Sequence, residues 1–331
     1  MPTNPVTSSF LADAPYFLDV DAVTWVEDTL AAMSVEERVG QLMCLYLRDS
    51  ASETWLEELA GRGIRPGGIL VLSRTRPDVG ADIERLQRFS TTPMLVAANL
   101  EAGLMLGGRT LEAFANPMQL AATGDSETAR RLAIHCARSA NATGVNWAFA
   151  PVIDIAVNPA NPITNTRTFG ADPDTVASFA TAYIRELESR GVATSPKHFP
   201  GDGVDDRDQH LVTTSNDLDS AAWWTTYGMV YRHAIEAGAK TIMAGHIRQP
   251  ALTREVDPSV EARAMMPATL SPELLGGVLR DRLGFDGLIV SDNSAMTGMT
   301  AMAPRRIALP RMLDSGIDMI LGNLDVDEDF R

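Results

Sequence analysis

Short apolar runs recur along the chain, each bounded by glycine, proline or polar residues and separated from the next by an amphipathic stretch. A run that is apolar on both faces is typical of a parallel strand buried beneath helices. The pattern predicts eight such strands, at 41–47, 67–73, 93–100, 145–155, 192–199, 241–247, 287–292 and 318–323.

Helices are expected between these strands. Asp172, followed by a proline, is a good helix start and predicts a helix over 174–190. Ser271, also followed by a proline, predicts a second capped helix, and residues 22–40 predict one or two helices ahead of the first strand. Strands that alternate with helices in this way indicate an α/β fold.

Polar residues gather at the C-terminal ends of the predicted strands. A barrel brings these ends together at one mouth. A doubly wound nucleotide-binding sheet would instead have a glycine-rich turn after its first strand, and none follows 41–47. We therefore expect residues 1–331 to form a single (β/α)8 TIM-type barrel. The residues at its mouth are Asn99, Glu101, Asp154, Lys197, His198, His246 and Asp292.

The end of the chain is unusual for such a barrel. After the eighth predicted strand only LDVDEDFR remains, which is too short for a closing helix. Either the barrel ends openly or the polypeptide continues. Because an uncovered apolar wall is costly, we expect a further C-terminal domain beyond residue 331, with the barrel here lacking its last helix.

Composition narrows the class of protein. The chain is 45% apolar and 21% charged, as in ordinary globular proteins, and its net charge of −15 argues against nucleic-acid binding. It has no basic N-terminal start followed by an apolar run, and no apolar stretch of about 18 residues. We expect a cytoplasmic protein without membrane contact, with Cys44 and Cys136 as buried free thiols.

Segment 195–214 carries the first candidate chemistry. Lys197 and His198 end a strand, and a glycine-rich loop follows. Asp208 and His210 are two residues apart, so in an extended loop the carboxylate can orient the imidazole and raise its pKa. A histidine held in this way can protonate a leaving oxygen and later accept a proton. The alternative is a solvated acidic loop with an incidental histidine.

Two further segments place charged groups at the mouth. In 284–296 an apolar strand runs into Asp292, which suits a nucleophile, a general base, a metal ligand or a helix cap. In 149–173 Asp154 ends a strand and Arg167 follows in a long loop. Arg167 suits a sugar hydroxyl or a carboxylate, or it pairs with Asp154 or Asp172 to hold the loop. The histidines lack the spacing of a zinc site, so we expect no metal and no other cofactor.

Together these segments resemble glycoside hydrolase family three, and in particular its β-N-acetylglucosaminidase branch. The motifs are APVIDI…NP…RTFGADP, KHFPGDG…DQH and GLIVSD, in the order and spacing of that family, and the resemblance covers roughly 36–323. It implies a retaining mechanism with a covalent glycosyl-enzyme intermediate. Asp292 matches the nucleophile, and Asp208 with His210 matches an acid/base dyad on a loop expected to swing in when substrate binds. The residues that match the sugar-binding positions are Arg167, Lys197, His198, Asn99 and Glu101.

The sequence also departs from the family pattern. The usual Asp-x-Glu-Gly-Gly motif is here Asn99-Leu100-Glu101-Ala102-Gly103, so a charge is lost where sugar hydroxyls are gripped. The usual histidine after KHFPG is Asp202, and Asn293 follows the nucleophile in place of the common aspartate. The loop is unusually acidic, with Asp202, Asp205, Asp206 and Asp208.

The leading hypothesis is an exo-acting β-N-acetylglucosaminidase of cell-wall recycling or amino-sugar salvage, with a substrate that contains N-acetylglucosamine. A phosphorylase is the first alternative, because a histidine acid/base repels phosphate less than a carboxylate does. The acidic loop argues against phosphate entry. A catalytically silent sugar-binding barrel is the second alternative, although it would be expected to have lost Asp292 or the dyad. The oligomeric state, the linkage and the aglycone are not determined by these motifs.

Overall fold

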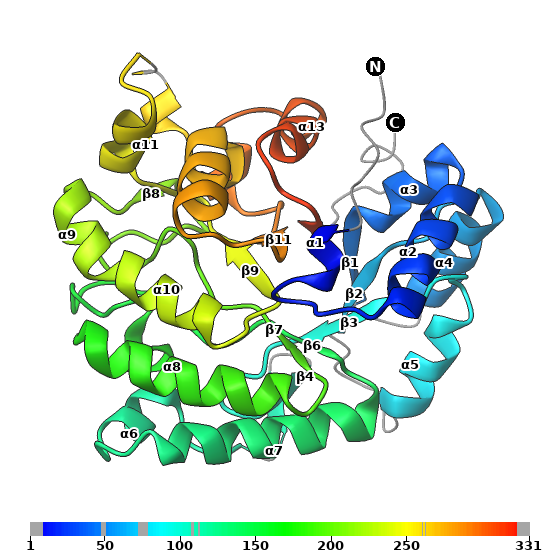
Figure 1. The fold of residues 1–331 in the computed structure, drawn as a ribbon, viewed down its shortest axis with the longest axis horizontal. Coiled ribbons are helices and arrows are strands. Elements are labelled where there is room, and N and C mark those ends of the chain that lie inside the picture. Colours follow the sequence, from blue (N-terminus) through cyan, green and yellow to red (C-terminus); the bar gives the residue numbers. More distant parts are fainter. Residues whose placement is uncertain are drawn as a thin grey trace.

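Parallel strands surrounded by helices form the body of the molecule (Figure 1). The structure is a computed structural model that describes residues 9–47, 51–71, 79–106, 109–111, 113–259, 261 and 263–322. Each of the eight predicted strands is present, and each is shorter than the apolar run that predicts it. They are β1 (Met43–Leu47), β2 (Gly68–Val71), β3 (Leu95–Ala98), β6 (Trp147–Ala148), β7 (Ala193–Thr194), β9 (Thr241–Ala244), β11 (Leu288–Ser291) and β12 (Ile320–Leu321).

The strands pair in parallel around a common centre. One sheet has the order β12-β1-β2-β3-β6-β7, and β9 pairs with β11. Isolated parallel bridges connect the two sets, from Phe199 to Ala244 and from Val290 to Met319. The α/β fold with a parallel sheet is therefore confirmed, and the pairings fit the expected barrel. Segment 324–331, the basis for expecting a missing last helix, lies outside the described residues.

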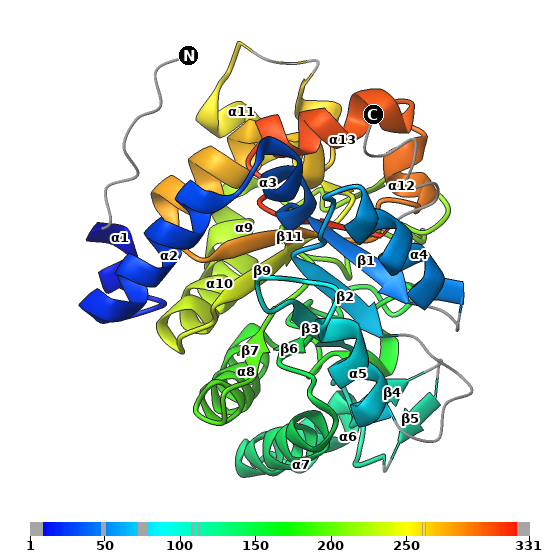
Figure 2. The same cartoon turned by 90° about the vertical axis from the view of Figure 1, so that its right-hand side faces the viewer.

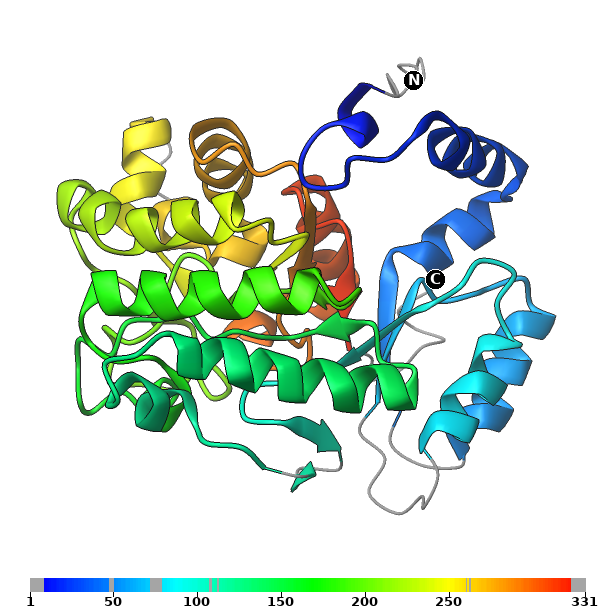
Figure 3. The same ribbon diagram turned by 60° about the horizontal axis from the view of Figure 1, so that its bottom comes forward.

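A helix lies between each pair of consecutive strands and packs on the outside of the sheet (Figures 2 and 3). The helices α7, α8 and α10 lie side by side along one wall, as their contacts also indicate. The connecting helices are α4 (Ala51–Gly61), α5 (Val79–Gln87), α7 (Glu127–Thr143), α8 (Pro173–Glu188), α10 (Tyr227–Glu236), η4 (Glu273–Arg282) and α13 (Arg305–Asp314).

The remaining elements cap or decorate this arrangement. As predicted, residues 22–40 form two helices ahead of the first strand, α2 and α3, and the short α1 precedes them. None of the helices in the described part of the chain is long and apolar enough to cross a membrane. The elements are α1 (Ser9–Ala12), α2 (Val20–Ala32), α3 (Val35–Gln41), β4 (Leu104–Leu106), β5 (Arg109–Leu111), α6 (Pro117–Ala121), η1 (Asn165–Arg167), β8 (Thr214–Ser215), α9 (Ser220–Thr225), β10 (Ile247–Arg248), α11 (Pro250–Val256), η2 (Arg263–Met265), η3 (Ala268–Leu270) and α12 (Thr297–Thr300).

The predicted helix starts are confirmed at the level of single hydrogen bonds. The carboxylate of Asp172 accepts from Thr175 N–H at the start of α8, and Ser271 Oγ accepts from Leu274 N–H ahead of η4. Helix η4 differs from an ordinary α-helix because its backbone bonds follow the wider π pattern. Its Gly277 faces Val256 so closely that a Cβ would lie 2.7 Å from a Val256 methyl carbon.

Two apolar cores result. The larger lies between the helices and the outer face of the strands, and the smaller, which includes Trp147, Phe149 and Val290, is formed by the opposite faces of the strands. Cys44 and Cys136 are buried free thiols, as predicted. The interior is thus filled with side chains, which leaves the C-terminal ends of the strands as the place for a site.

Candidate active site

A small cavity of about 150 Å³ lies where the strands end. Its walls come from residues far apart in sequence, at or just after the ends of β1, β2, β3, β6, β7, β9, β11 and β12 and on the loops that follow. The lining combines an apolar floor with polar and charged groups, the composition expected of a site for a small polar ligand. The lining residues are Tyr46, Leu70, Asn99, Phe149, Arg167, Lys197, His198, His210, Met243, Asp292, Asn293 and Leu321.

Glu101 holds two cations at one side of this cavity. Both of its oxygens accept from the Arg167 guanidinium, each at 2.8 Å, and Lys197 Nζ lies 2.8 Å from Oε1. Lys197 also donates to Asn99 Oδ1 at 3.0 Å. Burial raises the pKa of Glu101, but Lys197 and Arg167 outweigh burial, so the pKa of this carboxyl lies well below its usual range. The ionised carboxylate therefore fixes the direction of both cations.

The hypothesis that Arg167 pairs with Asp154 or Asp172 is wrong, because its partner is another carboxylate. Its guanidinium bonds to Glu101, and the carboxylate of Asp172 is engaged at the start of α8. Asp154 is also engaged elsewhere, with His198. The cause is a contact between segments 66 residues apart, which local spacing does not reveal.

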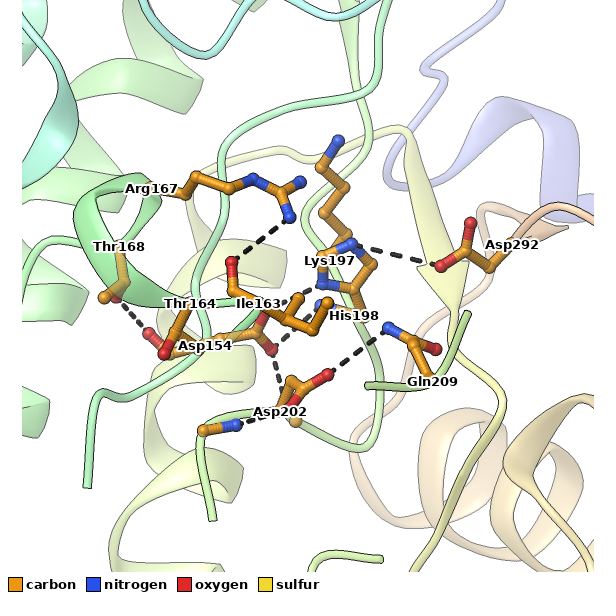
Figure 4. Close-up of polar contacts among 12 residues, drawn as sticks. Asp154, Ile163, Thr164, Arg167, Thr168, Lys197, His198, Asp202, Gln209 and Asp292 are labelled. Carbon is orange, nitrogen blue, oxygen red and sulfur yellow. Dashed lines mark hydrogen bonds and ion pairs between the residues drawn. The ribbon is translucent and has the colours of Figure 1, made fainter. Parts of the chain in front are cut away.

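His198 stands between two carboxylates (Figure 4). Its Nδ1 is 2.7 Å from Asp154 Oδ2, its backbone N–H donates to Asp154 Oδ1 at 3.0 Å, and its Nε2 is 4.0 Å from Asp292 Oδ2. Because a carboxylate accepts hydrogen bonds, Nδ1 carries a proton and the ring is held in one orientation. Asp154 is fully buried, and its hydrogen bonds to His198 connect it to the cavity.

Asp292 follows β11 directly and reaches the cavity with 14% of its side chain exposed. Its Oδ1 accepts from Asn293 N–H at 2.7 Å. Burial raises its pKa, but the interactions of the carboxylate with the neighbouring His198 and His246 and with the Asn293 N–H outweigh burial and lower the pKa overall. The residue at the start of α12 is Met296, so the helix-cap reading of Asp292 is wrong. A partly exposed, ionised carboxylate is the form needed to attack an electrophilic carbon.

Asp208 and His210 meet as predicted. Asp208 Oδ1 lies 2.7 Å from His210 Nδ1 and accepts from His210 N–H at 2.8 Å. The imidazole is 56% exposed and lines the cavity, and Thr297 N–H donates to its backbone oxygen at 3.1 Å. The dyad therefore lies at the open side of the cavity, with the proton of Nδ1 directed to Asp208.

The acidic loop does not line the cavity with its carboxylates. Asp202 is buried, Asp205 accepts from Arg207 at 2.6 Å and from Ser215 N–H at 2.8 Å, and neither Asp206 nor Asp208 is among the lining residues. Glycine is required where the loop begins, because a Cβ at Gly203 would overlap the carbonyl oxygen of Ile155. None of these four carboxylates therefore stands in the cavity wall itself, although Asp208 lies directly behind the His210 imidazole.

Two buried residues near the site were assigned no role from the sequence. Gln209 is fully buried between Asp202 and the backbone of His246. His246 is also buried, and its ring lies 3.0 Å from the carbonyl oxygen of Asn293. Their positions depend on contacts across the fold, although the place of His246 at a strand end was a partial signal.

The family comparison covers nearly the whole chain. Residues 34–327 match the model of the glycosyl hydrolase family 3 N-terminal domain. A β-N-acetylglucosaminidase/β-glucosidase of Cellulomonas fimi is 46% identical over 320 residues, which are 97% of this chain and 56% of that protein. The β-hexosaminidase LpqI of Mycobacterium tuberculosis is 30% identical over 304 residues, which are 88% of this chain and 74% of that protein.

Solved structures agree with this assignment. The β-glucoside phosphorylase BglX bound to 2FGlc superposes with a TM-score of 0.91 at 42% identity, over 98% of this chain and 58% of its own. A β-N-acetylglucosaminidase of Paenibacillus sp. FPU-7 gives a TM-score of 0.81 at 27% identity, over 90% of this chain and 56% of its own. The chain thus spans little more than half the length of several relatives that it matches. It belongs to glycosyl hydrolase family 3.

Proposed function

We propose that the protein is a retaining exo-β-N-acetylglucosaminidase in which Asp292 is the nucleophile and Asp208 with His210 forms the acid/base dyad. The observation that carries this proposal is that Asp292, with its lowered pKa, and His210 line the same cavity. A retaining glycosidase needs a carboxylate on one side of the bond and a proton donor on the other.

Each residue has a distinct role in the two steps of this reaction. Asp292 attacks the anomeric carbon, and the glycosidic bond to the leaving oxygen breaks as His210 protonates that oxygen. In the second step His210 takes a proton from the incoming acceptor, which attacks the anomeric carbon and releases Asp292. Arg167, Lys197, His198 and Asn99 hold the sugar hydroxyls, and Glu101 fixes the two cations.

The names of the relatives support the substrate class. The Cellulomonas fimi protein is named for N-acetylglucosaminide and glucoside cleavage, and LpqI is named a β-hexosaminidase. We further propose that the eight parallel segments close into a complete (β/α)8 barrel, and that the protein acts in the cytoplasm on cell-wall or amino-sugar material.

A second candidate function is phosphorolysis of the same bond. The carboxylates of the acidic loop do not line the cavity, whereas Arg167 and Lys197 do. Once Asp292 is esterified by the sugar its negative charge is gone, so the cavity wall becomes more positive at the step where an acceptor enters. Glu101 offsets part of this charge from behind the wall. BglX, named a β-glucoside phosphorylase, favours the same candidate.

Product analysis separates the two candidates. The protein is incubated with an aryl β-N-acetylglucosaminide, with and without millimolar phosphate, and the sugar products are identified. Free N-acetylglucosamine at a rate indifferent to phosphate supports the hydrolase. A faster reaction that yields the sugar 1-phosphate contradicts the hydrolase and supports the phosphorylase, and no aryl release in either buffer contradicts both.

A further inference from the structure

Gln209 lies between the two members of the dyad in sequence but is buried, unlike the histidine that follows it. Its side chain has no exposure, whereas the side chain of His210 is 56% exposed. We propose that Gln209 is a positioning residue that sets His210 against Asp292, by joining the acid/base loop to the loop of the nucleophile. The inference rests on the roles proposed above for Asp292 and His210.

The amide of Gln209 uses both of its ends. Nε2 donates to Asp202 Oδ2 at 3.3 Å, as Figure 4 shows, and Oε1 accepts from the backbone N–H of His246 at 3.0 Å. The backbone oxygen of Gln209 accepts from Gly298 N–H at 3.1 Å. A buried amide with both ends bonded is held in one rotamer, so the loop cannot shift at this point without leaving polar groups unpaired.

Asp202 is a rigid anchor on one side. Its backbone N–H donates to Asp154 Oδ1 at 2.7 Å, and its Oδ1 accepts from Asn161 Nδ2 at 2.7 Å. Its backbone oxygen accepts from the Tyr227 hydroxyl at 2.6 Å. Through Asp154, the same network orients His198. Gln209 is therefore bonded to the part of the site that faces the sugar.

His246 is the anchor on the other side. Its Nε2 is 3.0 Å from the carbonyl oxygen of Asn293, and its Nδ1 is 2.9 Å from Thr269 Oγ1. A carbonyl only accepts, so Nε2 carries the proton and Nδ1 accepts from the hydroxyl. Asn293 in turn donates from its N–H to Asp292 Oδ1 at 2.7 Å. Hydrogen bonds thus run from Gln209 through His246 to the residue beside the nucleophile.

The dyad itself has no comparable anchor. Within the described part of the chain, the hydrogen bonds of the Asp208 and His210 side chains are made between these two residues. The place of the imidazole relative to Asp292 consequently depends on the backbone, which Gln209 and the Thr297 N–H hold. Loss of the Gln209 side chain is expected to leave the dyad intact but poorly aimed at the leaving oxygen.

A leaving-group comparison tests this role. A dinitrophenolate leaves without protonation, whereas a phenolate leaves slowly unless an acid protonates its oxygen. We expect Gln209→Ala to lower kcat/KM by at least about tenfold for phenyl β-N-acetylglucosaminide and by less than about threefold for the 2,4-dinitrophenyl glycoside. Gln209→Asn, which keeps an amide but is one methylene shorter, is measured alongside in case the alanine variant does not fold.

Gln249→Ala is the matched control. Gln249 is equally buried and also uses both ends of its amide, donating to Leu218 O at 2.7 Å and accepting from Leu252 N–H at 2.8 Å, but it does not line the cavity. Its loss is expected to affect both substrates alike. An equal loss on both substrates in the Gln209 variants overturns the positioning role. If the unsubstituted protein releases no dinitrophenol at all, the proposed function fails instead.

Discussion

The Nε2 of His198 lies 4.0 Å from the Oδ2 of Asp292. Among the described residues, no other side chain donates a hydrogen bond to this oxygen, and the Asn293 N–H bonds to the other one, Oδ1. This separation is too long for a hydrogen bond, and it is short enough for a charge interaction when the imidazole is protonated. The imidazole of His198 is thus beside the Asp292 carboxylate, but it does not occupy the lone pairs of Oδ2 with a hydrogen bond. The charge of His198 is also the largest influence that lowers the pKa of Asp292, after burial has raised it.

Asp154→Asn tests whether this placement matters for turnover. The substitution keeps one oxygen acceptor but removes the charge that fixes the His198 ring, so the ring can turn or change its tautomer. We expect kcat to fall by about 10- to 100-fold, with a smaller change in KM, because a displacement of about 1 Å at the reacting centre costs that much. Steady-state kinetics with an aryl glycoside measure the split. Asp172→Asn, on the surface at the start of α8, is the control and is expected to leave both constants unchanged.

Asp292→Asn distinguishes an enzyme from a sugar-binding barrel. The amide is nearly the same size but cannot form the glycosyl ester, so we expect kcat to fall by about 10³-fold or more. The contacts of Arg167 and Lys197 with Glu101 do not involve Asp292, so N-acetylglucosamine is expected to bind with similar affinity in calorimetry. Full turnover in this variant contradicts the assignment of the nucleophile.

Glu101→Gln removes the carboxylate that Arg167 and Lys197 share. Because Lys197 is nearly buried, its charge is then left without its closest counter-ion. We expect the free energy of unfolding to fall by about 3 kcal/mol and KM to rise, since both cations lose their orientation.

The lowered pKa of Glu101 means that its stabilisation is present above about pH 4 and is lost as the pH falls.

Urea denaturation at pH 7 measures the stability change, and aryl glycoside kinetics measure KM. The half-buried Glu127 pairs with Arg130 on the same helix, α7, and supplies a control, Glu127→Gln, which is expected to change neither quantity measurably. A Glu101→Gln protein as stable as the unsubstituted one contradicts the shared-counter-ion account.

The strands, helix starts and strand-end charges could be predicted because each depends on local sequence. An apolar run such as 287–292 can be buried on both faces only as an inner strand, and Asp292 then follows from its place at the strand end. The contact between Asp208 and His210 could likewise be predicted from their spacing, since the two residues are close in sequence and bond to each other.

The contacts of Glu101 and Gln209 could not be predicted in the same way. Glu101 meets Arg167 across 66 residues, and Gln209 meets His246 across 37. Nothing in the local pattern indicates that Asp202 points inward while Asp206 points to solvent, because the alternation of faces that guides a strand is absent from an irregular loop. The acidic composition of this loop therefore suggested carboxylates at the cavity, whereas the fold places none of the four in the cavity wall.

The ionisation of Asp202 is expected to make the stability of the protein depend on pH. Burial and the neighbouring charge of Asp154 raise the pKa of Asp202 from 3.8 to about 6. Between these values the folded protein holds a proton that the unfolded chain has released, so stability falls as the pH rises from about 4 to about 6. Asparagine does not titrate, so we expect the free energy of unfolding of Asp202→Asn to lack this decrease. The difference between the variant and the unsubstituted protein should therefore grow by about 1–3 kcal/mol in favour of the variant over this pH range. Urea denaturation of both proteins at pH 4, 5, 6 and 7 measures the difference. Carboxyls that do not interact with Asp202 titrate equally in both proteins and cancel. A difference that stays flat with pH contradicts the raised pKa of Asp202.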